Sequence, residues 1–181
     1  MKRPFSTAFL IFLSAVLVLF GVFYGAYQGW RAEAARVDAL LKKDGGLNTM
    51  LVHRASDAAN LEKVALRHMA ASDTLLKALK DSRAAAADEK ASLHSRFNAN
   101  AQLDAAAEAV EKALNALPSF SASERDTNYV SAILRDMRQL AASGAADEYN
   151  SAARDYNDRL SRSLSGLLSR LIFNKPAQIF E

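Results

Sequence analysis

An uncharged run at the start of the chain most constrains what it can fold into. From Pro4 to Trp30 no side chain carries a charge, and Phe, Leu, Val, Ile and Ala dominate. About 20 apolar residues in a helix cross the hydrocarbon core of a membrane. Tyr24, Tyr27 and Trp30 gather at the far end of the run, as aromatic rings do at headgroup level. Residues 1–30 are therefore predicted to form one transmembrane anchor.

A cleaved signal peptide is the alternative interpretation of this run. Cleavage sites need small residues at two positions. The triplets Phe23-Tyr24-Gly25 and Tyr27-Gln28-Gly29 each place a bulky aromatic residue at the first of them. We therefore favour an uncleaved anchor. Lys2 and Arg3 flank its start, and because cationic residues favour the cytoplasmic side, the following domain is expected outside the cytoplasm.

Small residues line one face of the predicted anchor. Gly21, Gly25 and Gly29 are four residues apart, and Ser14 precedes Gly21 by seven residues. Such spacing lets two helix backbones approach closely in a membrane. We expect this glycine stripe to carry self-association of anchors or packing against the helix of a partner. The alternative is that these glycines have no such role, since glycine is common in membrane helices.

The rest of the chain has the pattern of helices rather than strands. Beyond residue 30 apolar residues recur at spacings of three and four, and strict two-residue alternation is absent. The stripes are narrow and nearly heptad-spaced, as in long antiparallel helices of a bundle. We predict an all-α fold, with an up-and-down bundle of about four helices over residues 31–175 and a tail over 176–181. The stripes occupy Leu51–Leu79, Leu93–Leu117 and Tyr129–Leu171.

Few positions interrupt these predicted helices. Asp44-Gly45-Gly46 and Leu117–Ser123 have the composition of connections, and Ala84–Asp88 is a weaker one. Ser123 is followed three residues later by Asp126, which resembles the signal at the start of a helix. We therefore expect a new helix to begin there.

The length of the first helix bears on its end. A helix that stopped at Gly45-Gly46 would extend only about 20 Å beyond the membrane, and the longer helices after it would overhang into the headgroups. We therefore expect the first helix to continue past these glycines and to turn near Arg54–Asp57. Gly144 is expected to bend the last helix without ending it.

The C-terminal part contains a more specific pattern. Tyr149-Asn150 and Tyr156-Asn157 are seven residues apart, with Arg154 between them. This pattern resembles the YNxxVRxYN signature of the LemA family, which are membrane-anchored helical proteins of bacteria. The resemblance implies a divergent member, with a four-helix up-and-down bundle behind an anchor in the bacterial inner membrane. Further matching positions are Trp30, Leu51, Arg54, Asn60, Leu61, Leu76, Arg83 and Ile179-Phe180-Glu181.

The signature residues also have a physical interpretation. The two tyrosines fall on the predicted core stripe, and the two asparagines with Arg154 form the neighbouring stripe. Buried asparagines need hydrogen-bond partners, so such residues fix the register between helices. We favour this structural role, with Arg54 and Asn60 on another helix as the partners. The alternative is that this polar stripe binds a ligand or a partner protein.

Side chains for catalysis or metal binding are few. The three histidines, His53, His68 and His94, lack the spacing of a bundle metal site, and the chain has no cysteine. Motifs of nucleotide-binding proteins and serine hydrolases do not occur. The net charge of +3 is spread too evenly for nucleic acid. We expect no enzyme, no cofactor, no metal site and no nucleic-acid partner, and we expect the histidines to be exposed or to cap helices.

The segment from Leu160 to Phe173 combines leucines with serines and arginines. A basic amphipathic helix can lie on a membrane surface. Such contact would use Leu164, Leu168, Arg162 and Arg170. We favour the other interpretation, in which this segment covers the base of the bundle.

Two hypotheses for function follow. The first is a membrane-anchored, non-catalytic scaffold that self-associates and organises membrane or partner proteins. The second is a ligand-sensing or accessory bundle that uses the Tyr/Asn/Arg stripe of the last helix. Both imply a single-pass protein with membrane lipids around its anchor, and the first implies a homo-oligomer. An unknown membrane protein is a further expected partner.

Overall fold

The structure is a computed structural model that describes residues 7–171 and 174–181, and these residues form helices and their connections. The all-α prediction is confirmed for this part of the chain. Lys2 and Arg3 lie outside the described residues, as does Phe173 at the end of the predicted amphipathic segment.

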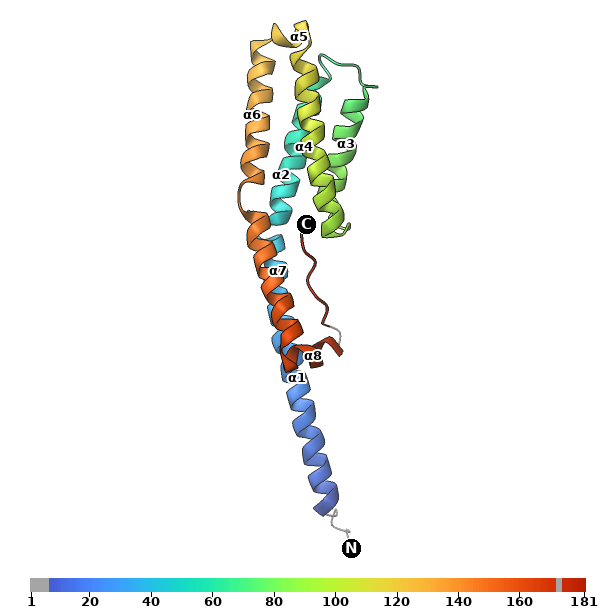
Figure 1. Ribbon diagram of the computed structural model, residues 1–181, viewed down its shortest axis with the longest axis vertical. Coiled ribbons are helices and arrows are strands. Elements are labelled where there is room, and N and C mark those ends of the chain that lie inside the picture. The colour runs from blue at the N-terminus through green and yellow to red at the C-terminus, as the bar shows by residue number, and fades with distance from the viewer. Residues whose placement is uncertain (1–6, 172–173) are drawn as a thin grey trace. The chain divides into compact units, whose positions relative to one another are not determined.

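The chain divides into two compact units. Unit 1 contains Met1–Asp38 and Ala152–Ala177, and unit 2 contains Ala39–Ser151 and Gln178–Glu181. The helices are α1 (Thr7–Lys42), α2 (Leu47–Ala65), α3 (Thr74–Ala87), α4 (Leu93–Asn115), α5 (Pro118–Ser121), α6 (Glu124–Ala141), α7 (Ala145–Arg162) and α8 (Leu164–Leu171) (Figure 1).

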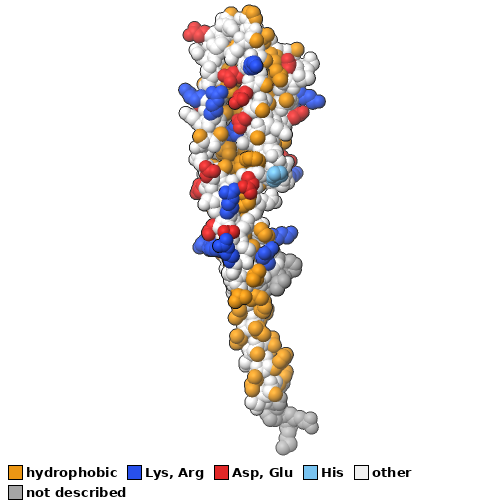
Figure 2. Space-filling model, in the orientation of Figure 1, with side chains coloured by type: hydrophobic (Ala, Val, Ile, Leu, Met, Phe, Trp, Pro, Cys, Tyr) orange, Lys and Arg blue, Asp and Glu red, His pale blue; other side chains and the backbone are white. Residues whose placement is uncertain are grey.

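In unit 1, α1 is long and apolar enough to cross a membrane, by length and composition. Apolar side chains cover the surface of its N-terminal part in the view of Figure 2. Further along α1, the Trp30 ring packs edge to face against Tyr156 of α7, with centroids 5.8 Å apart. Arg159 of α7 lies 3.3 Å from the Glu33 carboxylate. These contacts hold the described part of unit 1 together beyond the apolar stretch.

In unit 2, α2, α3, α4 and α6 form a helical bundle around one apolar core (Figure 1). The core residues follow the spacings of three and four that the sequence predicts. Ala58, Leu61 and Ala65 illustrate this on α2. The short helix α5 makes the corner between α4 and α6. The Ser123 hydroxyl accepts a hydrogen bond from the Asp126 N–H at 3.4 Å, so the predicted cap of α6 is confirmed.

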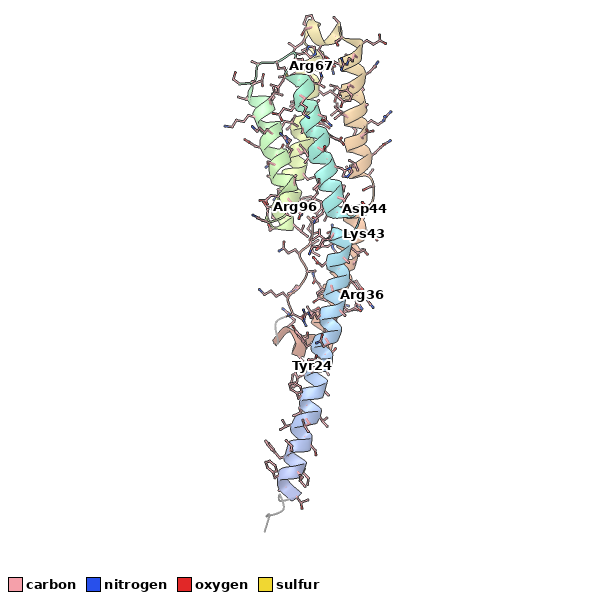
Figure 3. The ribbon with its side chains drawn as sticks, turned by 180° about the vertical axis from the view of Figure 1, so that it is seen from behind. Tyr24, Arg36, Lys43, Asp44, Arg67 and Arg96 are labelled. Carbon is pink, nitrogen blue, oxygen red and sulfur yellow. The ribbon has the colours of Figure 1, made fainter. Side chains whose placement is uncertain are left out.

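The first helix is interrupted where we expected it to continue. α1 ends at Lys42, and α2 begins only at Leu47 (Figure 3 shows Lys43 and Asp44 in the interruption). Gly45 has φ +72°, which side chains rarely adopt. The expected turn near Arg54–Asp57 is wrong, because α2 continues to Ala65. The left-handed glycine ends the helix locally, which the length argument overlooked.

Two more helix boundaries differ from the prediction. The Leu51–Leu79 stripe is not one helix, since a connection over residues 66–73 separates α2 from α3. The Asp73 carboxylate starts α3 by accepting the Leu75 N–H at 2.8 Å. Gly144, with φ +79°, separates α6 from α7 instead of bending one helix. The apolar spacing continues through both breaks, which is why periodicity alone did not find them.

Arg54 ties α2 to α4 inside the bundle. Its side chain is 0% exposed and donates to the carboxylate of Asp104 and to the amide oxygen of Asn100. Its Nε lacks a hydrogen-bond partner. A buried guanidinium with one unsatisfied N–H depends strongly on the partners that remain.

We therefore predict that Asp104→Ala lowers the free energy of unfolding by about 1–3 kcal/mol, because it leaves a buried charge with one fewer acceptor. Glu108→Ala, an exposed acidic position on the same helix, is the matched control and should change it by less than about 0.5 kcal/mol. Urea unfolding followed by circular dichroism measures both. Equal effects of the two variants would contradict this role for Arg54.

Candidate functional site

The polar stripe of α7 binds the main chain of the C-terminal segment, which we define as residues 174–181. In unit 2, the Asn150 side-chain amide makes two hydrogen bonds with Phe180. Asn150 Nδ2 donates to the Phe180 carbonyl oxygen at 2.9 Å, and the Phe180 N–H donates to Asn150 Oδ1 at 2.8 Å. A side-chain amide carries the same donor and acceptor as a peptide group. Asn150 therefore pairs with Phe180 much as a neighbouring β-strand would.

The same arrangement occurs in unit 1. Asn157 Nδ2 donates to the Ala177 carbonyl oxygen at 3.0 Å, and the Ala177 N–H donates to Asn157 Oδ1 at 2.7 Å. This fixes which atom of each amide is the oxygen, because a main-chain N–H needs an acceptor.

The tyrosine before each asparagine adds a third bond. The Tyr149 hydroxyl donates to the Gln178 carbonyl oxygen at 2.8 Å, within unit 2. The Tyr156 hydroxyl donates to the Lys175 carbonyl oxygen at 3.3 Å, within unit 1. Burial raises the pKa of Tyr156, which keeps its phenol protonated as a donor. In both units, the tyrosine thus bonds the residue two places before the one its asparagine holds.

In unit 2 the N-terminal turn of α4 provides further contacts. The Leu93 N–H donates to the Gln178 side-chain oxygen at 2.9 Å, and His94 Nδ1 lies 2.5 Å from the main-chain oxygen of Glu181. The Asn98 amide nitrogen lies 3.2 Å from His94 Nε2, which places the ring proton on Nδ1. Phe180 is 4% exposed and packs edge to face on Phe97 at 5.3 Å. The set Tyr149, Asn150, Leu93, His94 and Phe97 is called the unit 2 segment site below.

The predicted partners of the polar stripe are wrong. Arg54 bonds α4, as described above, and the bonds of Asn150 and Asn157 go to the C-terminal segment. Asn60 is half-buried on α2. The register interpretation assumed a helix as the partner, but an extended main chain satisfies a side-chain amide equally well.

The remaining signature positions have separate locations. Leu61 belongs to the bundle core. Arg83 donates to Glu62 at 2.8 Å, which joins α3 to α2. Arg154 is exposed on the unit 1 part of α7. Leu61 and Arg83 therefore have contacts of their own within the bundle of unit 2.

The residues predicted to contact a membrane or another anchor lie in unit 1. A Cβ added at Gly21, Gly25 or Gly29 would meet nothing within 4 Å, and Ser14 is exposed on the same helix. On and beside α8, Leu164 is 81% exposed, Arg162 and Arg170 are exposed, and Leu168 is half-buried. Both sets are thus open to contact.

A second polar cluster joins the connection 66–73 to the start of α6 and was missed. The His68 side chain is 8% exposed, with Nε2 2.9 Å from the Asp126 carboxylate and Nδ1 3.2 Å from the Ser119 hydroxyl. Arg67, labelled in Figure 3, binds the same carboxylate at 2.6 Å. The hydrogen bond from His68 and the charge of Arg67 lower the pKa of Asp126. Their sequence positions, about 60 residues apart, gave no signal of this contact.

This cluster includes the three side-chain types of a serine hydrolase, so its geometry matters. A hydrolase carboxylate orients the histidine and leaves the serine free to attack. Here Asp126 is shared with Arg67 and sits in the first turn of α6, where acidic residues stabilise the helix. The arrangement is suited to holding the corner of the bundle.

Comparison with known proteins found no matching family model, curated protein or solved structure.

We predict that Asn150→Leu frees the C-terminal segment and leaves the bundle folded. The Phe180 amide should exchange with deuterium about tenfold faster, because its acceptor is lost. Exchange-mass spectrometry of the full chain in detergent measures this. Asn128→Leu, at an exposed position on α6, is the matched control. Faster exchange throughout α2 and α4 would instead support a role in helix register.

A pH prediction follows from the lowered pKa of Asp126. The ionised carboxylate stabilises the fold above the unfolded pKa of about 3.9, and this contribution is lost as the pH falls through the lower folded value. Thermal unfolding of wild type should therefore lose stability below about pH 4 more steeply than Asp126→Asn. Asp81→Asn on α3 should behave like wild type. Identical acid profiles for all three proteins would contradict the prediction.

Proposed function

We propose that this chain is a membrane-anchored, non-catalytic helical scaffold that self-associates and organises membrane or partner proteins. The observation that carries the proposal is the apolar part of α1, whose large side chains from Leu10 to Val22 are exposed in the described chain. Such a surface is stable in lipid and costly in water. Insertion of α1 into a bilayer satisfies it.

Self-association is supported by the glycine stripe. Gly21, Gly25 and Gly29 share one face of α1, and the space beside each is open. In lipid, close backbone approach and packing drive helix association, which suits such a face. The LemA-like signature supports a bacterial inner membrane as the location.

A second candidate function is an accessory bundle that holds an extended peptide. The Tyr-Asn pairs support it, because in each unit three hydrogen bonds with two side chains engage peptide main chain, and none of these bonds needs a particular ligand side chain. Main-chain bonds of this kind provide affinity in peptide recognition.

The test uses the full chain produced in bacteria. Wild type should stay in carbonate-washed membranes and give crosslinked multimers there. Gly25→Leu should stay in the membrane but lose most of the multimers, at least about fivefold, because the added side chain separates the helices. A Cβ at position 25 meets no other atom of the chain within 4 Å, so we expect the leucine to leave the fold of the single chain unchanged.

Val16→Leu, on the opposite face of α1, is the matched control and should crosslink like wild type. Release of wild type by carbonate would overturn the anchor. Wild-type monomers in crosslinked membranes would overturn the scaffold.

A further inference from the structure

Residues Gln178–Glu181 occupy the unit 2 segment site as a bound peptide would. Gln178–Glu181 belong to unit 2, whereas the residues just before them belong to unit 1. The contacts within unit 2 are non-covalent: Asn150 and Tyr149 bind main chain, Leu93 binds the Gln178 amide, and Phe97 packs on Phe180. These contacts are what place the four residues in unit 2.

The site shows which chemistry it recognises. It takes an extended peptide, held through the N–H and carbonyl of one residue and the carbonyl of the residue two before it. Specificity comes from a glutamine at the first position and a buried aromatic ring at the third. The extended sequence Gln-Ile-Phe-Glu meets these requirements, and every copy of the chain carries it.

The contacts are the same whichever copy supplies the segment. Exchange of an identical element between copies replaces each contact by its equivalent, so its cost is low. The competing segment of the same chain has an effective concentration in the millimolar range. Exchange therefore needs dense copies, which a shared membrane would provide.

We propose that the unit 2 segment site binds Gln178–Glu181 of a second copy, so that copies are joined by exchange of their C-terminal segments. This inference rests on the proposed scaffold function and names a second contact surface for it, separate from the glycine stripe. In each exchanged pair, Asn150 of one copy holds Phe180 of the other.

The test separates the site from the segment in two full-length variants in mild detergent. The donor, Asn150→Leu, has a damaged site and an intact segment. The acceptor, Phe180→Ala, has an intact site and a segment without its buried ring. Neither variant can exchange with itself, but the donor segment can enter the acceptor site. Donor and acceptor carry different fluorophores, and energy transfer between them measures association.

We expect donor and acceptor to associate at least about tenfold more tightly than the acceptor with an Asn150→Leu/Phe180→Ala double variant, since about 1.4 kcal/mol corresponds to tenfold. Asn128→Leu/Phe180→Ala is the matched control acceptor and should bind the donor as Phe180→Ala does. Circular dichroism verifies that each protein is folded. If Asn150→Leu does not fold, Asn150→Asp serves as the donor protein. The aspartate keeps an oxygen that accepts the Phe180 N–H but has no N–H to donate to the Phe180 carbonyl.

Equal association in both mixtures overturns the exchange. Association through α1 would appear equally in every mixture. Multimers of wild type, without tighter association of donor and acceptor than of acceptor and double variant, would therefore overturn the exchange but not the scaffold. Donor–acceptor excess with monomeric wild type in membranes would show that the site can bind the segment of a second copy but that wild-type copies are not joined, which would overturn both the exchange and the scaffold. A folded acceptor that fails to bind the donor while capturing an unrelated Gln-x-Phe peptide also overturns exchange.

Discussion

Main-chain groups without a helix or a sheet must find partners elsewhere, and the C-terminal segment depends on this constraint. The segment forms no regular structure, yet Ala177 and Phe180 each have their N–H and carbonyl satisfied by one asparagine. Pro176 lacks an N–H and so needs one partner fewer. In each unit, one side-chain amide thus supplies both the donor and the acceptor that a neighbouring strand would supply.

The sequence predicted those elements in which one local signal dominates. The apolar run of α1 and the cap at Ser123 are both of this kind. The prediction failed where the same apolar spacing continues across a break, as at residues 66–73 and at Gly144. Asp73, the N-cap of α3, lies within the first of these breaks, and the regular apolar spacing on either side gives no indication of it.

The polar stripe of α7 was found from sequence, but its partner was not. Asn150 and Asn157 were identified from their spacing, and the need of buried amides for partners was inferred correctly in principle. Spacing along one helix does not say what lies opposite it, and Arg54 had a nearer partner in Asp104. Contacts such as His68 with Asp126, far apart in the chain, are a product of the fold and leave no local pattern.

The Tyr-Asn pairs bond the main chain of the segment, whereas other residues contact its side chains. The three bonds to main chain in each unit do not depend on the side chains of the segment, so any preference for particular side chains must come from other contacts. In unit 2 these contacts are made by Gln178, which meets the Leu93 N–H, and Phe180, which is buried against Phe97. In unit 1, the residue held by Asn157 is Ala177, whose methyl side chain has no hydrogen-bonding group and little surface for contact. Side-chain contacts to the segment are thus richer in unit 2 than at the Asn157 pair of unit 1.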